Sequence, residues 1–416
     1  MSEPAQDPNA FTIQPPATPG VMGWTGREGA LAGSGLGTRC VHGGAAPDPA
    51  YGAVAAPIYE TSTFALLDMR TSAGFEYTRA GNPTRARLEE AIALLEGGCG
   101  AICTSSGMSG ILAALCLLEH GSHVLCAMDC YGGTFRTLEH ARRVHGLQTT
   151  FLDLNDLGAV AAAVRPETRM IWAETPSNPL LRITDLAALA GLARSRGLLL
   201  AVDNTFMSPV LQRPFQCGAD LVFHSTTKYL NGHSDVIGGA VVAAPGRTDL
   251  LQRLGTLNMT LGTSQSPHDC ALVLRGLTTR HVRMRVHEAN ARAIAGFLAG
   301  HPAVARVNYP GLPGPPQHEL AGRQQAGYGA MLSFELQDGT PGSVRRLLRR
   351  LRWFTLAESL GGVESLVGHP ASMSHASMTA EMRERLGIRD GLIRLSVGIE
   401  DEADLVEDLR RALEGE

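Results

Sequence analysis

Five short apolar runs alternate with helical patterns along the chain, and this alternation restricts the fold more than any other feature. The helical stretch at residues 185–196, for example, places Leu186, Leu189, Ala190 and Ala193 on one face. Strands that are apolar on both sides and alternate with helices are typical of a parallel sheet covered by helices. We therefore expect an α/β fold with a mostly parallel sheet. The runs expected to form its strands are residues 123–128, 149–152, 170–173, 198–202 and 220–223.

The pattern changes along the chain and predicts four segments. Residues 1–37 are rich in Pro, Gly and Ala without a period, so we expect a flexible tail. Residues 38–82 contain short apolar pieces that cannot bury themselves, and we expect an N-terminal arm that contacts a neighbouring subunit. Residues 83–276 form the expected large domain and residues 277–416 a smaller α+β domain. Further elements are expected as helices at 84–96, 108–119 and 282–298 and a strand at 330–336.

Composition excludes several classes of protein. The chain has 416 residues, 44% of them hydrophobic and 18% charged, which is typical of a globular protein. Its net charge of -4 offers no basic excess for nucleic acid or an anionic membrane. The longest clean apolar run, residues 111–118, is too short to cross a bilayer, and acidic Glu3 and Asp7 argue against a signal peptide. The eight cysteines form no C-x-x-C pair, so we expect reduced thiols, a cytoplasmic location and no metal site.

The chain contains a single lysine, Lys228, among 36 basic residues. A compositional drift from Lys to Arg would explain the scarcity, since surface charges tolerate that exchange. Arg cannot supply a neutral amine, however, because its guanidinium stays protonated. The one position that kept Lys is therefore a candidate for amine chemistry, above all for a Schiff base.

The same count excludes familiar motifs. A phosphate-binding G-x-x-x-x-G-K-S/T loop is impossible, because Thr227 precedes Lys228, and the chain has no G-x-G-x-x-G, H-E-x-x-H or G-x-S-x-G. Residues 225–228 do fit the S-x-x-K pattern of penicillin-binding enzymes. That interpretation also needs a K-T-G, and no second lysine exists to supply it.

Reactive side chains gather where the expected strands end, which is the edge where open parallel sheets place their ligands. Together they suit pyridoxal phosphate: Lys228 for the aldehyde, Asp203 for the ring nitrogen and Tyr131 to stack on the ring. The start of the helix after residue 106 has free N–H groups that suit a phosphate. The expected phosphate ligands are Gly107, Met108, Ser225 and Thr227.

Each of these residues also has a structural interpretation when taken singly. A strand-end Asp is often a helix cap or turn residue, Ser-Gly pairs are common turns, and Tyr131 could be a packing residue. The joint occurrence with the sole lysine, 25 residues beyond Asp203, favours the cofactor site.

Seven stretches of the chain resemble the cystathionine γ-synthase and γ-lyase family of transsulfuration enzymes, which use pyridoxal phosphate. The likeness covers residues 38–412, and the lysine and A-E-S-L-G-G stretches are the most specific. The resemblance implies the type I fold of pyridoxal-phosphate-dependent transferases (aspartate aminotransferase-like), with a large domain and a smaller C-terminal α+β domain. The stretches are Y-T-R-A-G-N-P-T (77–84), S-S-G-M (105–108), Y-G-G-T (131–134), V-D-N-T (202–205), S-T-T-K-Y-L-N-G-H-S-D (225–235), A-E-S-L-G-G (357–362) and R-L-S-V-G (394–398).

The resemblance also implies individual roles. Lys228 would hold the cofactor as a Schiff base and shuttle protons, with Tyr131 assisting, and Asp203 would pair with the ring nitrogen. Tyr77 and Arg79 would reach the phosphate of a neighbouring subunit, in a homotetramer built from two dimers. Further cofactor contacts would come from Asn178, Gly107, Met108, Ser225 and Thr227.

The implied substrate residues are Arg394, Ser359 and Asn178 for the α-carboxylate and Glu358 and Arg136 for the distal part. Arg suits a two-pronged grip on a carboxylate. An ordinary salt bridge is the alternative for Arg394, although it stands in a strand-like apolar run where an unpaired Arg is costly. A solvated helix residue is the alternative for Glu358.

The family resemblance favours γ-chemistry, because E-S-L-G-G at 358–362 is closer to that branch than to the β-lyases. Gly133 stands where methionine γ-lyases carry Cys and argues against that relative. Stretches 176–182 and 329–336 resemble bacterial γ-synthases, so we expect a synthase that joins an activated homoserine to cysteine. A γ-lyase, which splits cystathionine into cysteine, 2-oxobutanoate and ammonia, is the alternative. A non-catalytic scaffold with this fold is a remote third.

Overall fold

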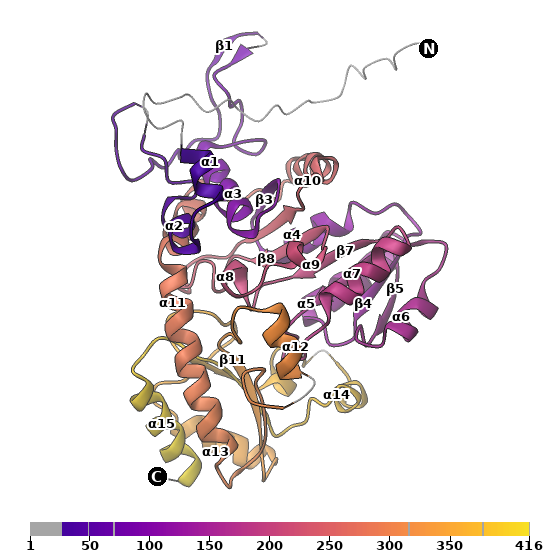
Figure 1. Cartoon of the computed structure of the whole chain (residues 1–416), viewed down its shortest axis with the longest axis vertical. Helices are drawn as coiled ribbons and strands as arrows, with labels where there is room; N and C mark the ends of the chain where they lie inside the picture. The colour runs from indigo at the N-terminus through magenta and orange to yellow at the C-terminus, as the bar shows by residue number, and fades with distance from the viewer. Residues whose placement is uncertain (1–26, 49, 70, 315–316, 377, 416) are drawn as a thin grey trace.

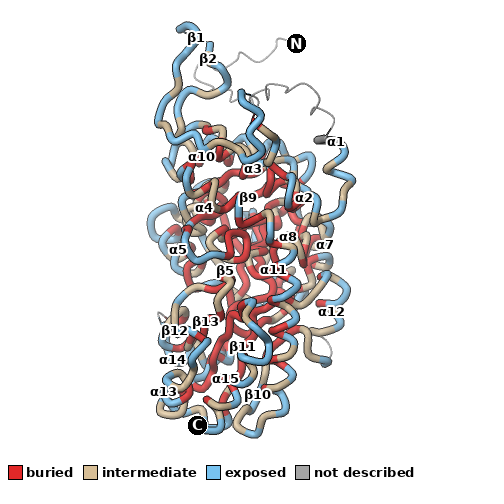
Figure 2. The backbone as a smooth tube through the Cα atoms, turned by 90° about the vertical axis from the view of Figure 1, so that its left-hand side faces the viewer, coloured by how far each residue is buried: buried red, intermediate tan, exposed pale blue. Residues whose placement is uncertain are grey.

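Two β-sheets, one in each lobe, organise the molecule, and one long helix runs along both (Figure 1). The computed structural model describes residues 27–415 except 49, 70, 315–316 and 377. Buried residues line the middle of both lobes, while the helices and loops around them are exposed on their outer sides (Figure 2).

The larger sheet has seven strands in the order β3-β9-β8-β7-β6-β4-β5. The five expected strands are present, and they are parallel to one another. The expectation missed β3 and β9, and β9 runs antiparallel to both of its neighbours, so the sheet is mixed. The strands are β3 (Gly100–Thr104), β4 (His123–Ala127), β5 (Gln148–Leu152), β6 (Thr168–Glu174), β7 (Leu199–Asp203), β8 (Leu221–Ser225) and β9 (Gly239–Ala243).

Helices cover this sheet, and short polar signals set their ends. The first of them, α3, starts at Asn82, whose side chain accepts the N–H groups of Thr84 and Arg85, and ends at Gly97 with a φ of 82°. The helices around the sheet are α3 (Pro83–Glu96), α4 (Gly107–Leu115), α5 (Gly132–Val144), α6 (Leu157–Ala163), α7 (Leu186–Ser195), α8 (Ser208–Leu211), α9 (Pro214–Cys217) and α10 (Thr248–Leu261).

Helix α11 (Pro267–Ala299) has 33 residues and is much longer than the expected helix at 282–298. The expected large domain ends at Gly276, but this residue lies inside the helix. A Cβ at this position would come 2.3 Å from the Asn231 carbonyl oxygen, so the glycine permits a close approach rather than a helix end. The expected boundary between residues 276 and 277 therefore falls within one continuous helix. No helix in the described part of the chain has the length and apolar character needed to span a membrane.

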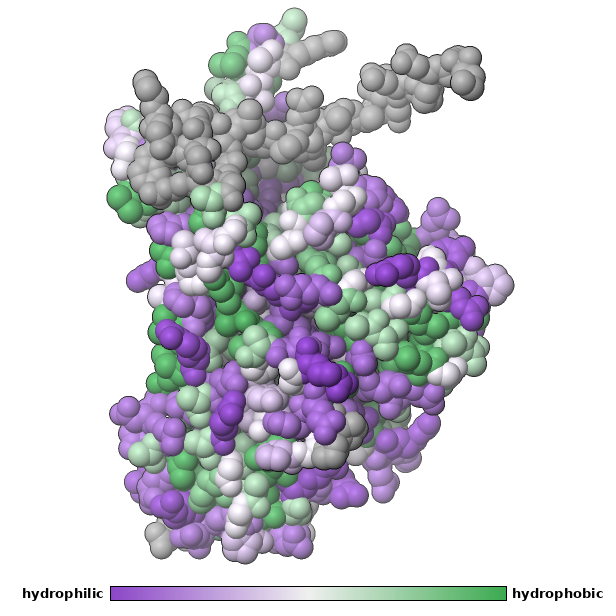
Figure 3. All heavy atoms as spheres, in the orientation of Figure 1, coloured by the Kyte–Doolittle hydropathy of each residue, from purple (hydrophilic) through white to green (hydrophobic). Residues whose placement is uncertain are grey.

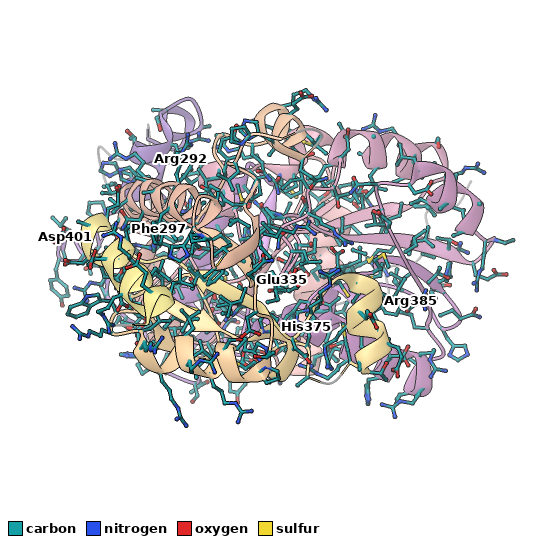
Figure 4. The ribbon with its side chains drawn as sticks, turned by 90° about the horizontal axis from the view of Figure 1, so that it is seen from below. Arg292, Phe297, Glu335, His375, Arg385 and Asp401 are labelled. Carbon is teal, nitrogen blue, oxygen red and sulfur yellow. The ribbon has the colours of Figure 1, made fainter. Side chains whose placement is uncertain are left out.

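The second sheet has five strands in the order β10-β11-β14-β13-β12 and packs with α11 and α15 in its own core. Phe297 of α11 lies beside α15, where the Arg410 guanidinium carbon is 5.6 Å from its ring centroid (Figure 4). The elements of this lobe are β10 (Val304–Asn308), α12 (Gln317–Gln324), β11 (Met331–Leu336), α13 (Pro341–Arg350), β12 (Thr355–Leu356), β13 (Leu366–Gly368), η1 (Pro370–Ser372), α14 (Ala380–Leu386), β14 (Leu392–Ser396) and α15 (Glu402–Glu414).

The N-terminal region projects from the end of the molecule opposite the C-terminal lobe (Figures 1 and 3). Residues 1–26 of the expected tail lie outside the described residues, but residues 27–37 include α1 (Arg27–Ala32) and the start of α2 (Leu36–His42). Cys40, in the part of α2 that belongs to the expected arm, is buried in the main core. A small hairpin, β1 (Leu66–Asp68) and β2 (Thr71–Ser72), extends outward.

Residues 45–80 leave large apolar side chains uncovered. Tyr51 is 94% exposed, Val54 85% and Met69 95%. Figure 3 shows hydrophobic residues on this projection. Isolated apolar residues on a surface are ordinary, whereas here several lie in one segment.

Candidate active site

The register of the large sheet places two carboxyl groups and an aromatic ring on one face. Glu174 pairs with Asp203 across β6 and β7, and Asp203 pairs with Phe223 across β7 and β8. Directly paired residues point to the same side of a sheet. Both acids are the last residues of their strands and are buried, so they lie side by side at the carboxyl edge.

The two acids have raised pKa values. Burial is the main cause for Asp203, partly opposed by hydrogen bonds from Thr205, whose N–H is 2.9 Å from Asp203 Oδ1. Burial also raises the pKa of Glu174 well above its ordinary value, and the neighbouring Asp203 and Cys130 raise it further. A cation placed at this edge would favour the ionised form of these acids.

Lys228 follows β8 and carries its amine toward the second lobe. Its Nζ donates a hydrogen bond to Ser359 Oγ at 2.5 Å. Burial lowers the pKa of the amine to about 8, with Arg394 lowering it further and Glu358 opposing the shift. A substantial fraction of the amine is neutral near pH 8, as nucleophilic and proton-transfer chemistry requires.

A glycine-lined cradle lies at the start of α4. The first N–H groups of a helix have no carbonyl partner within it, and here they belong to Gly107 and Met108. A Cβ on Gly107 would come 3.2 Å from Ser225 Cβ, so the main chain lies directly against that residue. Thr227 is close by, but its Oγ1 accepts the Gly238 N–H at 3.0 Å, so it also secures a neighbouring loop.

Tyr131 stands at the start of α5, beside the same edge. Its main-chain N–H donates to Glu174 Oε2 at 2.7 Å. A Cβ on Gly133 would come 2.3 Å from Tyr131 Cε1 and 2.6 Å from Met108 Sδ. The tyrosine ring therefore occupies the space that any larger residue at 133 would need.

Arg394 reaches the site from β14 of the second sheet and is buried. Its Nη1 donates to Asn178 Oδ1 at 3.1 Å and its Nη2 to the Ser359 carbonyl oxygen at 2.9 Å. Ser359 has a φ of 86°, an uncommon conformation for a residue other than glycine. Its hydroxyl thus contacts Lys228 while its carbonyl holds Arg394. Arg394 is therefore a buried residue held by hydrogen bonds and does not stand in a surface salt bridge.

Three further charged or titratable groups lie around Lys228 and Arg394. Glu358 is exposed and acts electrostatically on both Lys228 and Arg394. Arg136 is on α5, and its Nη1 would lie 3.4 Å from a Cβ on Gly132. His375 (Figure 4) is fully buried and close to Arg394; burial, with Arg394 and Arg136, lowers its pKa to about 4. The sequence assigned no role to Glu174 or His375: the hydrogen-bond donor to Glu174 is 43 residues away, and the arginines that act on His375 are also distant along the chain.

Tyr77 and Arg79 do not join this group within the chain. Arg79 Nη1 donates to the Met259 carbonyl oxygen of α10 at 2.8 Å, and the guanidinium lies 5.6 Å from the Tyr77 ring. None of the hydrogen bonds described for these two residues reaches Lys228 or its neighbours.

The residues present fit pyridoxal phosphate. They offer an amine of lowered pKa, a buried carboxyl for a ring nitrogen, a stacking ring and a helix start against Ser225. A family model described as Cys/Met metabolism PLP-dependent enzyme matches residues 37–414. The chain belongs to this family.

Relatives within the family carry different activities. The cystathionine β-lyase of Lactococcus lactis is 47% identical over 91% of this chain and 98% of its own. The cystathionine γ-lyase of Bacillus subtilis is also 47% identical, with the same coverage. The solved structure of cystathionine γ-synthase from Xanthomonas oryzae, in complex with aminoacrylate and cysteine, is 49% identical with a TM-score of 0.89, over 92% of this chain and 98% of that one.

These likenesses, together with the site, make this family member a pyridoxal-phosphate-dependent enzyme of cystathionine metabolism, of the γ-synthase or γ-lyase type. Overall identity does not separate the individual reactions, because relatives with three activities are nearly equally similar. Among the described residues, no group of three or more His, Cys, Asp or Glu side chains is placed to hold a metal ion.

Proposed function

We propose that the enzyme is a cystathionine γ-synthase that joins an activated homoserine to cysteine. The observation that carries the substrate class is the shared contact at Ser359, which bonds Lys228 through its hydroxyl and Arg394 through its carbonyl. An amine that reacts at Cα and a guanidinium that grips an α-carboxylate therefore face one small space. That arrangement suits an α-amino acid.

Bound pyridoxal phosphate supplies an aldehyde for the substrate amine and an electron-withdrawing ring. Asp203 would keep the ring nitrogen protonated, while Gly107, Met108, Ser225 and Thr227 would hold the phosphate. Lys228 would take the proton from Cα of the substrate and return it to another atom of the substrate. The amine can accept a proton because part of it is neutral near pH 8.

Arg394 and Asn178 would fix the α-carboxylate, and this grip orients Cα toward Lys228. Glu358 and Arg136 would then face the distal part of the substrate, where an activated homoserine carries its leaving group. Tyr131 would stack on the cofactor ring from its place over Gly133.

The synthase is favoured over the γ-lyase by the stretches at 176–182 and 329–336, which resemble bacterial γ-synthases. The test is to incubate the pure protein with acetyl, succinyl and phosphate esters of homoserine, with and without cysteine, and to identify the products. A synthase forms cystathionine only when both substrates are present.

Other products would contradict this proposal. Release of 2-oxobutanoate and ammonia from cystathionine as the main reaction would indicate the γ-lyase, which the likeness to the Bacillus subtilis enzyme supports. Release of pyruvate and homocysteine would indicate a β-lyase. A colourless protein without activity would indicate the scaffold.

We also propose a cytoplasmic homotetramer of two dimers with shared sites. The exposed apolar residues of the arm and the position of Tyr77 and Arg79 away from their own Lys228 support the sharing. The eight unpaired cysteines fit a reducing compartment. The division at residues 37, 82 and 276 into tail, arm and two domains is part of the same proposal.

A further inference from the structure

Glu174 is a buried acid for which the proposed mechanism has no task. It ends β6, is 5% exposed, and lies next to Asp203 in the sheet register. Among the described residues, its carboxyl makes one hydrogen bond, which it accepts at 2.7 Å from the main-chain N–H of Tyr131. This hydrogen bond ties the main chain of Tyr131 to the sheet edge that carries Asp203, although Tyr131 and Glu174 are 43 residues apart along the chain.

The groups that face Glu174 are all acidic or neutral. They are Asp203 from β7, Asp129 and Cys130 from the segment after β4, and the Tyr131 main chain. The guanidinium of Arg182, from the loop after β6, lies 3.9 Å from the Asp129 carboxylate. Burial and like charges therefore both favour the protonated form of Glu174. Two buried carboxylates side by side cannot readily both be ionised.

The contact with Tyr131 matters because it sets where the ring lies. The tyrosine is the residue before the first turn of α5, and its own side chain does not cap that helix. Its ring lies over Gly133 and against Met108, so a small shift of the main chain would move the ring off the cofactor face.

We propose that Glu174 is a positioning residue that, as a neutral acid, holds the main chain of Tyr131 and leaves Asp203 as the single carboxylate for the ring nitrogen. The proposal rests on the pyridoxal phosphate function argued above. Two variants of Glu174 can test this role. Gln keeps a neutral side chain with a hydrogen-bond acceptor, whereas Leu has no acceptor and is apolar.

The test measures the dissociation constant of pyridoxal phosphate on the stripped protein, together with the visible circular dichroism of the bound cofactor. Glu174→Gln should bind within roughly threefold of the original protein, with a similar dichroism. Glu174→Leu should bind roughly tenfold more weakly or worse, with a diminished dichroism, because the buried Tyr131 N–H loses its acceptor. Glu288→Leu is the matched control, because Glu288 of α11 accepts the Tyr328 main-chain N–H at 3.1 Å in the second lobe, and its loss should leave the dichroism in place.

Hydrogen exchange of the Tyr131 amide gives a second readout. In the stripped, unsubstituted protein, where no variant has to fold, the amide should be protected from exchange. The same amide should stay protected in Glu174→Gln. Free exchange in the folded protein would overturn the proposal, as would equal losses in the Gln and Leu variants or no loss in either. Failure of the unsubstituted protein to bind pyridoxal phosphate would instead contradict the proposed function.

Discussion

Burial acts in opposite directions on the two residues at the centre of the site. It lowers the pKa of the Lys228 amine and raises that of the Asp203 carboxyl, because removal from water disfavours either charged form. For the lysine, the result is a base available near neutral pH. For the aspartate, the result is a group that gains most when a cation, such as a protonated ring nitrogen, lies beside it.

The pKa of Lys228 predicts how cofactor loading depends on pH. An ordinary lysine has a pKa of 10.5, but here the value is about 8. The reactive form is the neutral amine, so its fraction rises with pH and reaches one half near pH 8. The initial rate of cofactor attachment to the stripped protein, followed by absorbance, should therefore rise from pH 7 to pH 9 and then level off. A rate that still climbs steeply at pH 10 would contradict the shift.

Asp203→Asn should leave the shape of the site intact but remove its charge. The Asn oxygen can still accept the Thr205 N–H, so the turn is preserved. We expect the cofactor to stay bound and turnover to fall by a hundredfold or more, roughly the effect of losing a preorganised charge in a buried site. Asp185→Asn, which changes the cap of α7, is the control and should affect turnover little. Unchanged turnover in Asp203→Asn would reduce this residue to a turn former.

At the scale of elements, the site is assembled where helix starts from one lobe meet a strand from the other. Helices α4 and α5 present Met108 and Tyr131, and β14 presents Arg394. The two lobes are joined at this point by Ser333 of β11, which pairs with Arg394 and donates to the Pro179 carbonyl oxygen at 2.8 Å. The loop that carries Asn178 is thereby held against the strand that carries Arg394.

The start of α5 leaves no room for a side chain at Gly133. Gly133→Ala would place a Cβ 2.3 Å from Tyr131 Cε1, so the ring must move. We expect kcat/KM to fall roughly tenfold to a hundredfold with the fold retained, as judged by circular dichroism. Gly255→Ala in α10, where a Cβ meets nothing within 4 Å, should leave kcat/KM alone and stabilise the protein by about 0.5–1 kcal/mol. Normal activity in Gly133→Ala would show that the ring position is unimportant.

The prediction of the fold from the sequence succeeded where patterns are local. Strands, helices and the residues at strand ends follow from apolar spacing, and Lys228 stood out by its rarity. The antiparallel direction of β9 depends on the strands that lie beside it in space. The apolar spacing along the chain carries no information about strand direction. The expected domain boundary at Gly276 falls inside α11, and the close approach of this glycine to Asn231 is a tertiary contact that sequence patterns do not show. Glu174 was passed over because its partner is a main-chain N–H, which leaves no trace in side-chain patterns.

At the scale of the whole molecule, the arm presents apolar surface and places Arg79 away from its own Lys228. Two inactive variants, Arg79→Ala and Lys228→Ala, can be mixed under conditions that exchange subunits. If sites are shared, each mixed dimer has one site with both changes and one site with neither. Activity should therefore return to about a quarter of the original, since half the dimers are mixed and one of their two sites is sound. Differently tagged chains verify exchange, and mixtures that exchange yet stay inactive would show that each site is built within one chain.

The position of the only lysine side chain, half-buried against Ser359, has a consequence for peptide mapping. A protease that cleaves solely after lysine can cut this chain at one bond, into residues 1–228 and 229–416. That bond lies inside the site and is protected until the two lobes separate or the chain unfolds. Limited digestion would therefore act as a single-bond reporter of opening at the site, with no background of cuts elsewhere on the surface.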